Sequence, residues 1–290
     1  MKKALIIGAG PAGISASLYI SRSNCCKATV ISNGQSALAK ADMIENYFGF
    51  AEPVSGQVLL ENGRKNAQRL GAEFIDGELI ELQLTADMKF SAVFSAGKQD
   101  IFDTVLIATG ASRKTPDITG LKSFEGKGIS YCAVCDAFFY RGKPTAVIGS
   151  GEYAAHEAET LSGTSSSVTI VTNGEELTAS LPENIICITD KIKEISGDGK
   201  VERIVFENDK EIDISGIFIA VGTAGSTDIA RKTGAVIDEN KIIVDENMQT
   251  NVPGLFAAGD CTGGLLQVSK AVSDGAIAGL GMIRFIKSKK

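Results

Sequence analysis

Two cysteines separated by two residues are the most reactive feature of this 290-residue sequence. Cys132 and Cys135 lie in the run Cys-Ala-Val-Cys-Asp, and thiols at this spacing can close into a disulfide and reopen by exchange. One thiol of such a pair can be held as a thiolate, which is the nucleophile in exchange. Asp136 follows directly, so its carboxylate can move protons as a dithiol forms. We interpret these three residues as a redox site; the alternative is a pair of cysteines buried for packing alone.

The other cysteines do not extend this site into a metal centre. Zinc sites need four ligands, and no second Cys-x-x-Cys or histidine pair is present, because His156 is the only histidine. The cysteine spacing also differs from that of iron–sulfur cluster ligands. We therefore predict no metal. A packing role is expected for the four remaining cysteines, Cys25, Cys26, Cys187 and Cys261.

A glycine-rich turn near the amino terminus predicts a dinucleotide site. Gly8, Gly10 and Gly13 form Gly-x-Gly-x-x-Gly between a strand-like run at residues 4–7 and an amphipathic helical stretch. Glycines there let a pyrophosphate approach the backbone, and the helix N-terminus favours its negative charge. The acidic residue that usually follows about twenty positions later is missing. Ser32 stands there instead and keeps a hydroxyl that can bind a ribose.

The pattern of strand, glycine turn and helix recurs at residues 145–161. A third landmark is a buried strand that ends at Gly259 and Asp260, and it precedes an amphipathic helix predicted from Gln267 to Lys287. Strands that alternate with helices around such turns predict an α/β protein. We expect two Rossmann-like three-layer nucleotide-binding domains.

Composition limits the partners. The net charge is −6 at pH 7, which argues against nucleic acid because a polyanion would be repelled. No apolar run is long enough to cross a membrane, and no signal-peptide pattern precedes the first glycine turn. Six cysteines are too sparse for a secreted disulfide scaffold. We predict a cytoplasmic protein that binds neither nucleic acid nor membrane.

These motifs, in their order and spacing, resemble those of low-molecular-weight thioredoxin reductases. The resemblance covers nearly the whole chain and also includes the runs Glu45-Asn46-Tyr47, Ala108-Thr109-Gly110 and Phe138-Phe139-Tyr140. It implies a homodimer whose FAD-binding domain consists of residues 1–113 and 242–290. Residues 114–241 would form a central, NADPH-domain-like domain that carries the cysteine pair. Together with Ser32, the predicted FAD contacts are Gly8, Gly10, Gly13, Asn46, Thr109, Gly110, Asp260 and Gln267.

The resemblance also implies roles for the redox residues. In the family the second cysteine faces the flavin and the first attacks the protein disulfide, which assigns Cys135 to FAD and Cys132 to thioredoxin. Asp136 matches the acid that handles protons. Phe138 and Phe139 resemble an aromatic pair that helps to dock thioredoxin, and core packing is the alternative for these two side chains.

One segment departs from the family pattern where the NADPH 2′-phosphate would bind. The family has a His-Arg-Arg-type cluster there, whereas residues 172–177 read Thr-Asn-Gly-Glu-Glu-Leu and no basic residue appears before Lys191. A charge-assisted hydrogen bond contributes about 1.5–3 kcal/mol, so losing two weakens NADPH binding by about a hundred- to ten-thousandfold. The chain therefore most resembles ferredoxin-dependent flavin thioredoxin reductases, which keep FAD and the cysteine pair but lack the NADPH motifs.

We predict a flavin-dependent disulfide reductase that passes electrons from reduced ferredoxin through FAD and the Cys132–Cys135 dithiol to thioredoxin. Three alternatives stay open at this point. The donor can be NADH, with Glu175 as the ribose ligand, or NADPH. Electron flow can be reversed, as in a dithiol oxidase that uses oxygen. The chain can also be a non-enzymatic flavin redox sensor.

Overall fold

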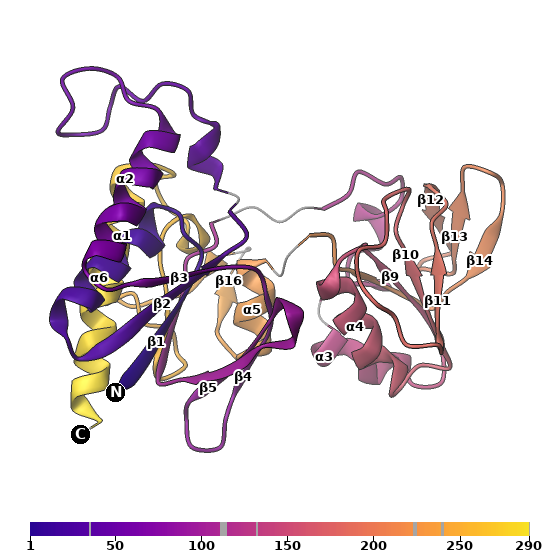
Figure 1. Ribbon diagram of the computed structural model, residues 1–290. Coiled ribbons are helices and arrows are strands. Elements are labelled where there is room, and N and C mark those ends of the chain that lie inside the picture. Colours follow the sequence, from indigo (N-terminus) through magenta and orange to yellow (C-terminus); the bar gives the residue numbers. More distant parts are fainter. Residues whose placement is uncertain (35, 111–114, 132, 223–224, 239–240, 290) are drawn as a thin grey trace. The chain divides into compact units, whose positions relative to one another are not determined.

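The computed structural model describes residues 1–34, 36–110, 115–131, 133–222, 225–238 and 241–289. The chain divides into two compact units, one of Met1–Ser112 and Gly225–Lys290 and the other of Arg113–Ala224 (Figure 1). The first unit is discontinuous because the second is inserted into it. Each unit is built on its own parallel sheet, which confirms the predicted α/β class.

A five-stranded parallel sheet in the order β18-β7-β1-β2-β3 forms the centre of the first unit. Its strands are β1 (Lys2–Ile7), β2 (Cys26–Ser32), β3 (Glu73–Asp76), β7 (Thr104–Ile107) and β18 (Leu255–Ala257). The central strands are almost continuously apolar, because both faces of the sheet are covered. On one face α1 (Pro11–Ser23) packs against α2 (Gly56–Arg69) and α6 (Val268–Ser288) (Figure 1).

The first unit also contains smaller elements. An antiparallel sheet of β4 (Leu79–Leu84), β5 (Phe90–Phe94) and β6 (Gln99–Phe102) lies on the side of the central sheet away from those helices (Figure 1). The remaining elements are η1 (Ala37–Lys40), η2 (Ser95–Gly97), α5 (Ser226–Lys232), β16 (Ile237–Asp238), β17 (Lys241–Ile242) and η5 (Asp260–Thr262).

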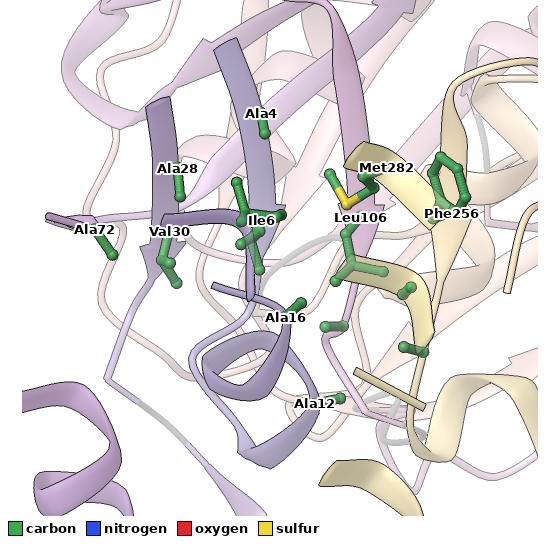
Figure 2. Packing of buried hydrophobic residues seen from close by; sticks show 14 of the residues in the cluster. Ala4, Ile6, Ala12, Ala16, Ala28, Val30, Ala72, Leu106, Phe256 and Met282 are labelled. Atoms are coloured by element: carbon green, nitrogen blue, oxygen red, sulfur yellow. The ribbon is translucent and has the colours of Figure 1, made fainter. Parts of the chain in front are cut away.

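Small residues bring α1 and α6 into close contact above the sheet. Figure 2 shows Ala12 and Ala16 of α1 in the same cluster as Ile6 of β1 and Leu106 of β7. A Cβ atom at Gly275 of α6 would lie 2.1 Å from the carbonyl oxygen of Ala12, so only glycine permits this approach. The packing holds the start of α6 beside the start of α1, where the first glycine turn lies.

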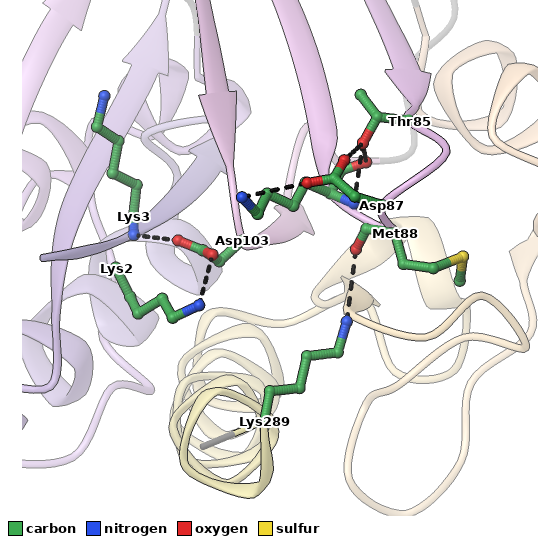
Figure 3. Close-up of polar contacts among 8 residues, drawn as sticks. Lys2, Lys3, Thr85, Asp87, Met88, Asp103 and Lys289 are labelled. Carbon is green, nitrogen blue, oxygen red and sulfur yellow. Dashed lines mark hydrogen bonds and ion pairs between the residues drawn. The ribbon is translucent and has the colours of Figure 1, made fainter.

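Polar contacts lie near the amino-terminal end of β1, at the end of the sheet away from the first glycine turn (Figure 3). The Asp103 carboxylate accepts from the Lys3 backbone N–H at 2.8 Å and from Lys2 Nζ at 3.2 Å. Lys289, after the end of α6, donates to the carbonyl of Met88 at 3.5 Å. The ion pair between Lys2 and Asp103 is solvent-exposed on the lysine side, and surface ion pairs contribute little to stability, about 0–1 kcal/mol each. The residues predicted to bind FAD lie elsewhere, at or beyond the carboxyl ends of the strands.

The second unit has a parallel sheet in the order β11-β10-β9-β15-β8 and an antiparallel sheet in the order β12-β13-β14. In the parallel sheet, α4 (Glu152–Ser162) connects β9 to β10, whereas residues 172–184 connect β10 to β11 without a helix or strand. The strands are β8 (Ile129–Ser130), β9 (Pro144–Ile148), β10 (Ser167–Val171), β11 (Ile185–Ile188), β12 (Ile192–Ser196), β13 (Arg203–Phe206), β14 (Glu211–Asp213) and β15 (Gly216–Ile219). The short helices are η3 (Lys122–Phe124), α3 (Ala133–Asp136) and η4 (Ala137–Tyr140).

The second boundary between the units differs from the sequence-based expectation. The chain returns to the first unit at Gly225 and not at residue 242. The reason is α5, whose Asp228 is buried and accepts from the Gly225 N–H at 3.0 Å, and which packs on β4, β7, β16 and β17. Asn251 fixes the segment that follows, because its side chain bonds the backbone of Gly234 and Val236.

Candidate active site

Two of the predicted redox residues, Cys135 and Asp136, lie in α3, a single helical turn in the second unit. Cys135 is disulfide-bonded, whereas Cys25, Cys26, Cys187 and Cys261 are free. Cys132, the predicted partner of Cys135, lies outside the described residues. Among the cysteines of the described part of the chain, Cys135 is therefore the one in the oxidised form from which exchange chemistry starts.

Three of the free cysteines, Cys26, Cys187 and Cys261, have a raised thiol pKa, which disfavours the thiolate that exchange needs. Burial, reinforced by the neighbouring Cys25, raises the pKa of Cys26, and burial raises the pKa of Cys261 to about 12. Both side chains contribute to packing, as predicted. The prediction is wrong for Cys187, which is exposed and lies in β11, the edge strand of its sheet. Desolvation still raises the pKa of the Cys187 thiol.

Ser130 fixes the carboxylate of Asp136. The Ser130 hydroxyl, at the end of β8, donates to Asp136 Oδ2 at 2.6 Å. Burial, and then the charge of Asp136, raise the pKa of Tyr140, whose ring packs edge-on against Phe218 of β15. Ser130 thus holds the carboxylate of Asp136, which follows Cys135 in the sequence and can move protons during disulfide reduction.

An apolar surface lies beside the disulfide. The aromatic patch consists of Phe138, Phe139 and Val134, whose residues are 69%, 68% and 52% exposed. The guanidinium of Arg141 lies 5.2 Å from the centroid of the Phe138 ring. Exposed aromatic side chains with a neighbouring arginine are typical of protein-binding surfaces. The exposure of both phenylalanines excludes the core-packing alternative.

The first glycine turn connects β1 to α1 in the first unit. Gly8 has φ +109°, and a Cβ atom there would lie 2.3 Å from the carbonyl oxygen of Ala108. A Cβ atom at Gly13 would lie 2.0 Å from the carbonyl oxygen of Gly8. At Gly10, in contrast, only the Ser36 hydroxyl would come within 4 Å, at 3.9 Å. Two glycines therefore serve the fold, whereas the third leaves open space at the N-terminus of α1.

The other predicted FAD contacts follow the carboxyl ends of neighbouring strands or lie in the loops beyond them. Ser32 ends β2, and its hydroxyl accepts from the Gly34 N–H at 3.1 Å. Thr109 and Gly110 follow β7, and Asp260 begins η5 after β18. The loop residue Asn46 donates to Gln267 Oε1, at the start of α6, at 3.2 Å. The fold thus brings segments far apart in the sequence to one edge of the sheet, where Rossmann-type ligands bind.

Lys270 and Asp274 anchor the loop at Asp260, and neither was predicted from the sequence. Lys270 Nζ donates to the carbonyl oxygens of Gly259 and Gly263 at 3.0 and 2.6 Å, and it pairs with Asp274 Oδ2 at 2.7 Å. Asp274 in turn accepts from the Gly259 N–H at 3.2 Å. The sequence did contain a signal for the ion pair, because a lysine and an aspartate four residues apart on a helix lie on the same face.

The residues at this edge fit a dinucleotide. The Thr109 hydroxyl is buried and has no hydrogen-bond partner among the described residues, which suits a group that binds a polar ligand. Gly10 leaves room for a phosphate at the start of α1, whose first N–H groups have no intrahelical acceptor. When bound, FAD supplies an electron carrier that accepts electrons singly and delivers a pair to a disulfide.

The second glycine turn, at Gly149–Gly151, has different surroundings. A Cβ atom at Gly149 would lie 2.2 Å from the carbonyl oxygen of Ala220, so this glycine serves packing. The backbone N–H and the hydroxyl of Thr178 both donate to the carbonyl oxygen of Ser150, at 2.8 and 3.1 Å. The segment that follows β10 therefore folds back onto the turn and holds it. Glu175 and Glu176 of this segment are exposed.

The pyridine nucleotide-disulphide oxidoreductase family matches residues 2–275 of the chain. A thioredoxin reductase of Aquifex aeolicus is 34% identical over 304 aligned positions, which cover 99% of this chain and 94% of the relative. The chain belongs to the thioredoxin reductase family. Family members are FAD-binding flavoproteins, so the predicted cofactor and the predicted family are confirmed.

Two solved structures of the family are similar over essentially the whole chain. The atypical thioredoxin reductase TRi of Desulfovibrio vulgaris Hildenborough is 36% identical, with a TM-score of 0.91 and coverage of 100% of this chain and 99% of that one. The ferredoxin-flavin thioredoxin reductase of Clostridium acetobutylicum is 28% identical, with a TM-score of 0.72 and coverage of 99% and 98%. No helix in the described part of this chain is long and apolar enough to span a membrane.

Proposed function

We propose that this chain takes electrons from reduced ferredoxin and uses them, through FAD and the Cys132–Cys135 pair, to reduce thioredoxin. The surroundings of the second glycine turn are the main support for ferredoxin as the electron donor. The contacts from Thr178 hold the turn with the chain's own residues, and two exposed glutamates follow β10 where a 2′-phosphate would need cations. The similarity to the ferredoxin-flavin thioredoxin reductase of Clostridium acetobutylicum supports the same choice.

The chemistry of the pair follows from exchange. Two electrons and two protons convert the disulfide of Cys135 to a dithiol. The Cys132 thiolate then attacks the thioredoxin disulfide, which forms a mixed disulfide and releases one thioredoxin thiolate. Cys135 breaks the mixed disulfide and closes the intramolecular bond, so that thioredoxin leaves as a dithiol. Asp136, fixed by Ser130, exchanges protons with the thiols. The aromatic patch is the surface proposed to dock thioredoxin.

Binding of FAD is proposed to use the residues at the carboxyl edge of the first sheet. The amide groups at Gly10 and Gly13 would hold the pyrophosphate, and Thr109 would supply its unpartnered hydroxyl. Asp260 is presented by the loop that Lys270 anchors. Ser32, Gly8, Asn46, Gly110 and Gln267 complete the proposed contacts.

Assembly as a cytoplasmic homodimer is part of the proposal. An apolar recess lies between α1, α2 and α6 of the first unit and is lined by Leu18, Leu59 and Val272, among others. Phe48, in the loop before α2, is 96% exposed. Exposed apolar surface of this kind favours burial against a second copy. Light scattering of the purified chain at twice the monomer mass supports the dimer, and a monomer mass contradicts it.

An NADPH donor is the second candidate, and Lys191 favours it. The aliphatic part of Lys191 lies beside Gly174, where a Cβ atom would come within 2.8 Å of it, so one cation does flank the turn after β10. Anaerobic titration separates the two candidates. We expect the flavin absorbance to bleach with reduced ferredoxin and its regenerating system, and thioredoxin to be reduced in many turnovers. Rapid bleaching by micromolar NADPH or NADH would reject ferredoxin as the donor.

A further inference from the structure

A buried acidic residue of the second unit contacts the redox segment directly. Glu157 lies on α4 and is 1% exposed. Its Oε2 atom accepts from the backbone N–H of Ala133 at 2.8 Å, and Ala133 is itself fully buried. Burial of a carboxyl group is unfavourable unless it is hydrogen-bonded, so this contact accounts for an acidic side chain on the buried face of the helix.

The contact affects the redox pair because of where Ala133 lies in the sequence. Ala133 follows Cys132 in the sequence and is one of the two residues that join it to Cys135. Between two thiols, the equilibrium between disulfide and dithiol depends on how closely the backbone holds them together, because a fixed segment raises their effective concentration. A hydrogen bond that holds the joining segment in both redox forms therefore favours the disulfide.

We propose that Glu157 is a positioning residue for the redox pair: it accepts the Ala133 N–H, fixes the segment between the two cysteines and so sets the equilibrium between their disulfide and dithiol forms. This inference rests on the proposed role of the pair. It also gives α4 a structural role besides following the glycine turn that Thr178 holds, because α4 packs against α3, which contains Cys135.

Three variants of the full-length, FAD-loaded chain test the proposal. Glu157→Asp keeps the charge but shortens the side chain by one methylene, so it loses the bond. Glu157→Gln keeps an oxygen acceptor of the same reach. Glu159→Gln is the control, because Glu159 lies on the same helix but its side chain is exposed, whereas that of Glu157 is buried. The fraction of alkylated Cys132 and Cys135 is measured by mass spectrometry in mixtures of reduced and oxidised dithiothreitol.

We expect Glu157→Asp to shift the equilibrium toward the dithiol by at least about tenfold, which corresponds to about 30 mV for this two-electron couple. Glu157→Gln and Glu159→Gln should stay within about threefold of the wild type. An unshifted Glu157→Asp variant overturns the proposal, and so does a Glu157→Gln variant shifted as far as Glu157→Asp. No ferredoxin or thioredoxin enters this titration, so an error in the proposed donor or substrate leaves its result intact.

Amide exchange at Ala133 provides the second measurement, which decides the matter if Glu157→Asp fails to fold. Protection of this N–H in both the wild type and Glu157→Gln supports the proposal. Exchange at the rate of an exposed amide in either protein overturns it.

Discussion

The two glycine turns of this chain start from the same local plan and end in different surroundings. Each follows a buried parallel strand, and each precedes a helix whose capping glycine has ordinary extended backbone angles, Gly10 in one unit and Gly151 in the other. A Cβ atom would fit equally well at both positions. Its nearest neighbour would be a hydroxyl oxygen at 3.9 Å, that of Ser36 at Gly10 and that of Thr178 at Gly151. The glycine pattern alone therefore does not distinguish them.

What distinguishes them is the chain that follows the second strand. In the first unit, the Ser36 hydroxyl after β2 would lie 3.9 Å from a Cβ atom at Gly10, and the buried Thr109 hydroxyl lacks a partner among the described residues. After β10 in the second unit, the chain returns and Thr178 bonds the turn itself. A strand, glycine turn and helix thus form the same backbone arrangement in both units. The segment that follows the second strand determines whether a ligand or the protein itself can bind the turn.

The largest effect should come from the disulfide, the feature that gives the second unit its chemistry. Cys135→Ser removes the thiol that resolves the mixed disulfide, so thioredoxin reduction should fall below detection. Bound FAD, measured by its absorbance after gel filtration, should stay at the wild-type level because Cys135 belongs to the other unit. Multiple turnovers by this variant would contradict the assignment.

Matched substitutions at the two capping glycines test the comparison itself. Gly10→Ala places a methyl group in the space proposed for the pyrophosphate, and FAD binding should weaken by at least about a hundredfold. Gly151→Ala should leave both FAD binding and ferredoxin-driven turnover within about twofold of the wild type. The FAD dissociation constant, from quenching of flavin fluorescence, is the measurement. A loss of turnover in Gly151→Ala would show that the second turn still binds a nucleotide.

Substitution of Thr109 or Thr178, one beside each glycine turn, should have smaller effects. Thr109→Val removes a hydroxyl without a protein partner, so the apoprotein should unfold at the wild-type temperature while FAD binds about tenfold more weakly. Thr178→Val should do the reverse: it lowers the unfolding temperature by a few degrees, because about 1 kcal/mol of hydrogen bonding is lost, and it leaves FAD affinity unchanged. Equal effects of the two changes on FAD affinity would erase the distinction between the turns.

The smallest expected effect concerns the free thiols. With a pKa of about 12, Cys261 should be about one ten-thousandth thiolate at pH 8, and its reaction with iodoacetamide should rise tenfold per pH unit until the fold is lost. Cys187 is exposed and should react first. Peptide mapping after timed alkylation gives both rates. Fast labelling of Cys261 in the folded protein at pH 8 would contradict its burial in the first unit.

Elements with strong local patterns could be predicted from the sequence. The strand, turn and helix at Gly8 and at Gly149 formed where expected, and α6 covers Val268–Ser288 where Gln267 to Lys287 was predicted. Apolar periodicity and glycine spacing act within a few residues, so they can be read directly. The return to the first unit at Gly225 was missed because α5 has only seven residues, too few for a periodic signal.

Contacts between distant residues could not be predicted in the same way. Ser130 with Asp136 is a short-range pair, but Thr178 with Ser150, Glu157 with Ala133 and Lys270 with Gly259 depend on how strands and helices meet. The proposed FAD contacts were predicted from the family resemblance, since the packing of strands and helices around them could not be predicted from the sequence. The sequence did show that residues 172–190 contain no lysine or arginine, which is a local property, but it did not show that the fold brings Lys191 beside Gly174.

The insertion of one unit into the other also constrains how the protein is made. In the first sheet β7 pairs with β1 on one side and with β18 on the other, and β18 begins at Leu255. A chain emerging from the ribosome can complete its second unit while the first still has β7 as an open edge. Closing that edge requires a contact across the whole inserted unit, which is slow compared with local pairing. Saturation with flavin should therefore follow release of the finished chain rather than accompany its synthesis.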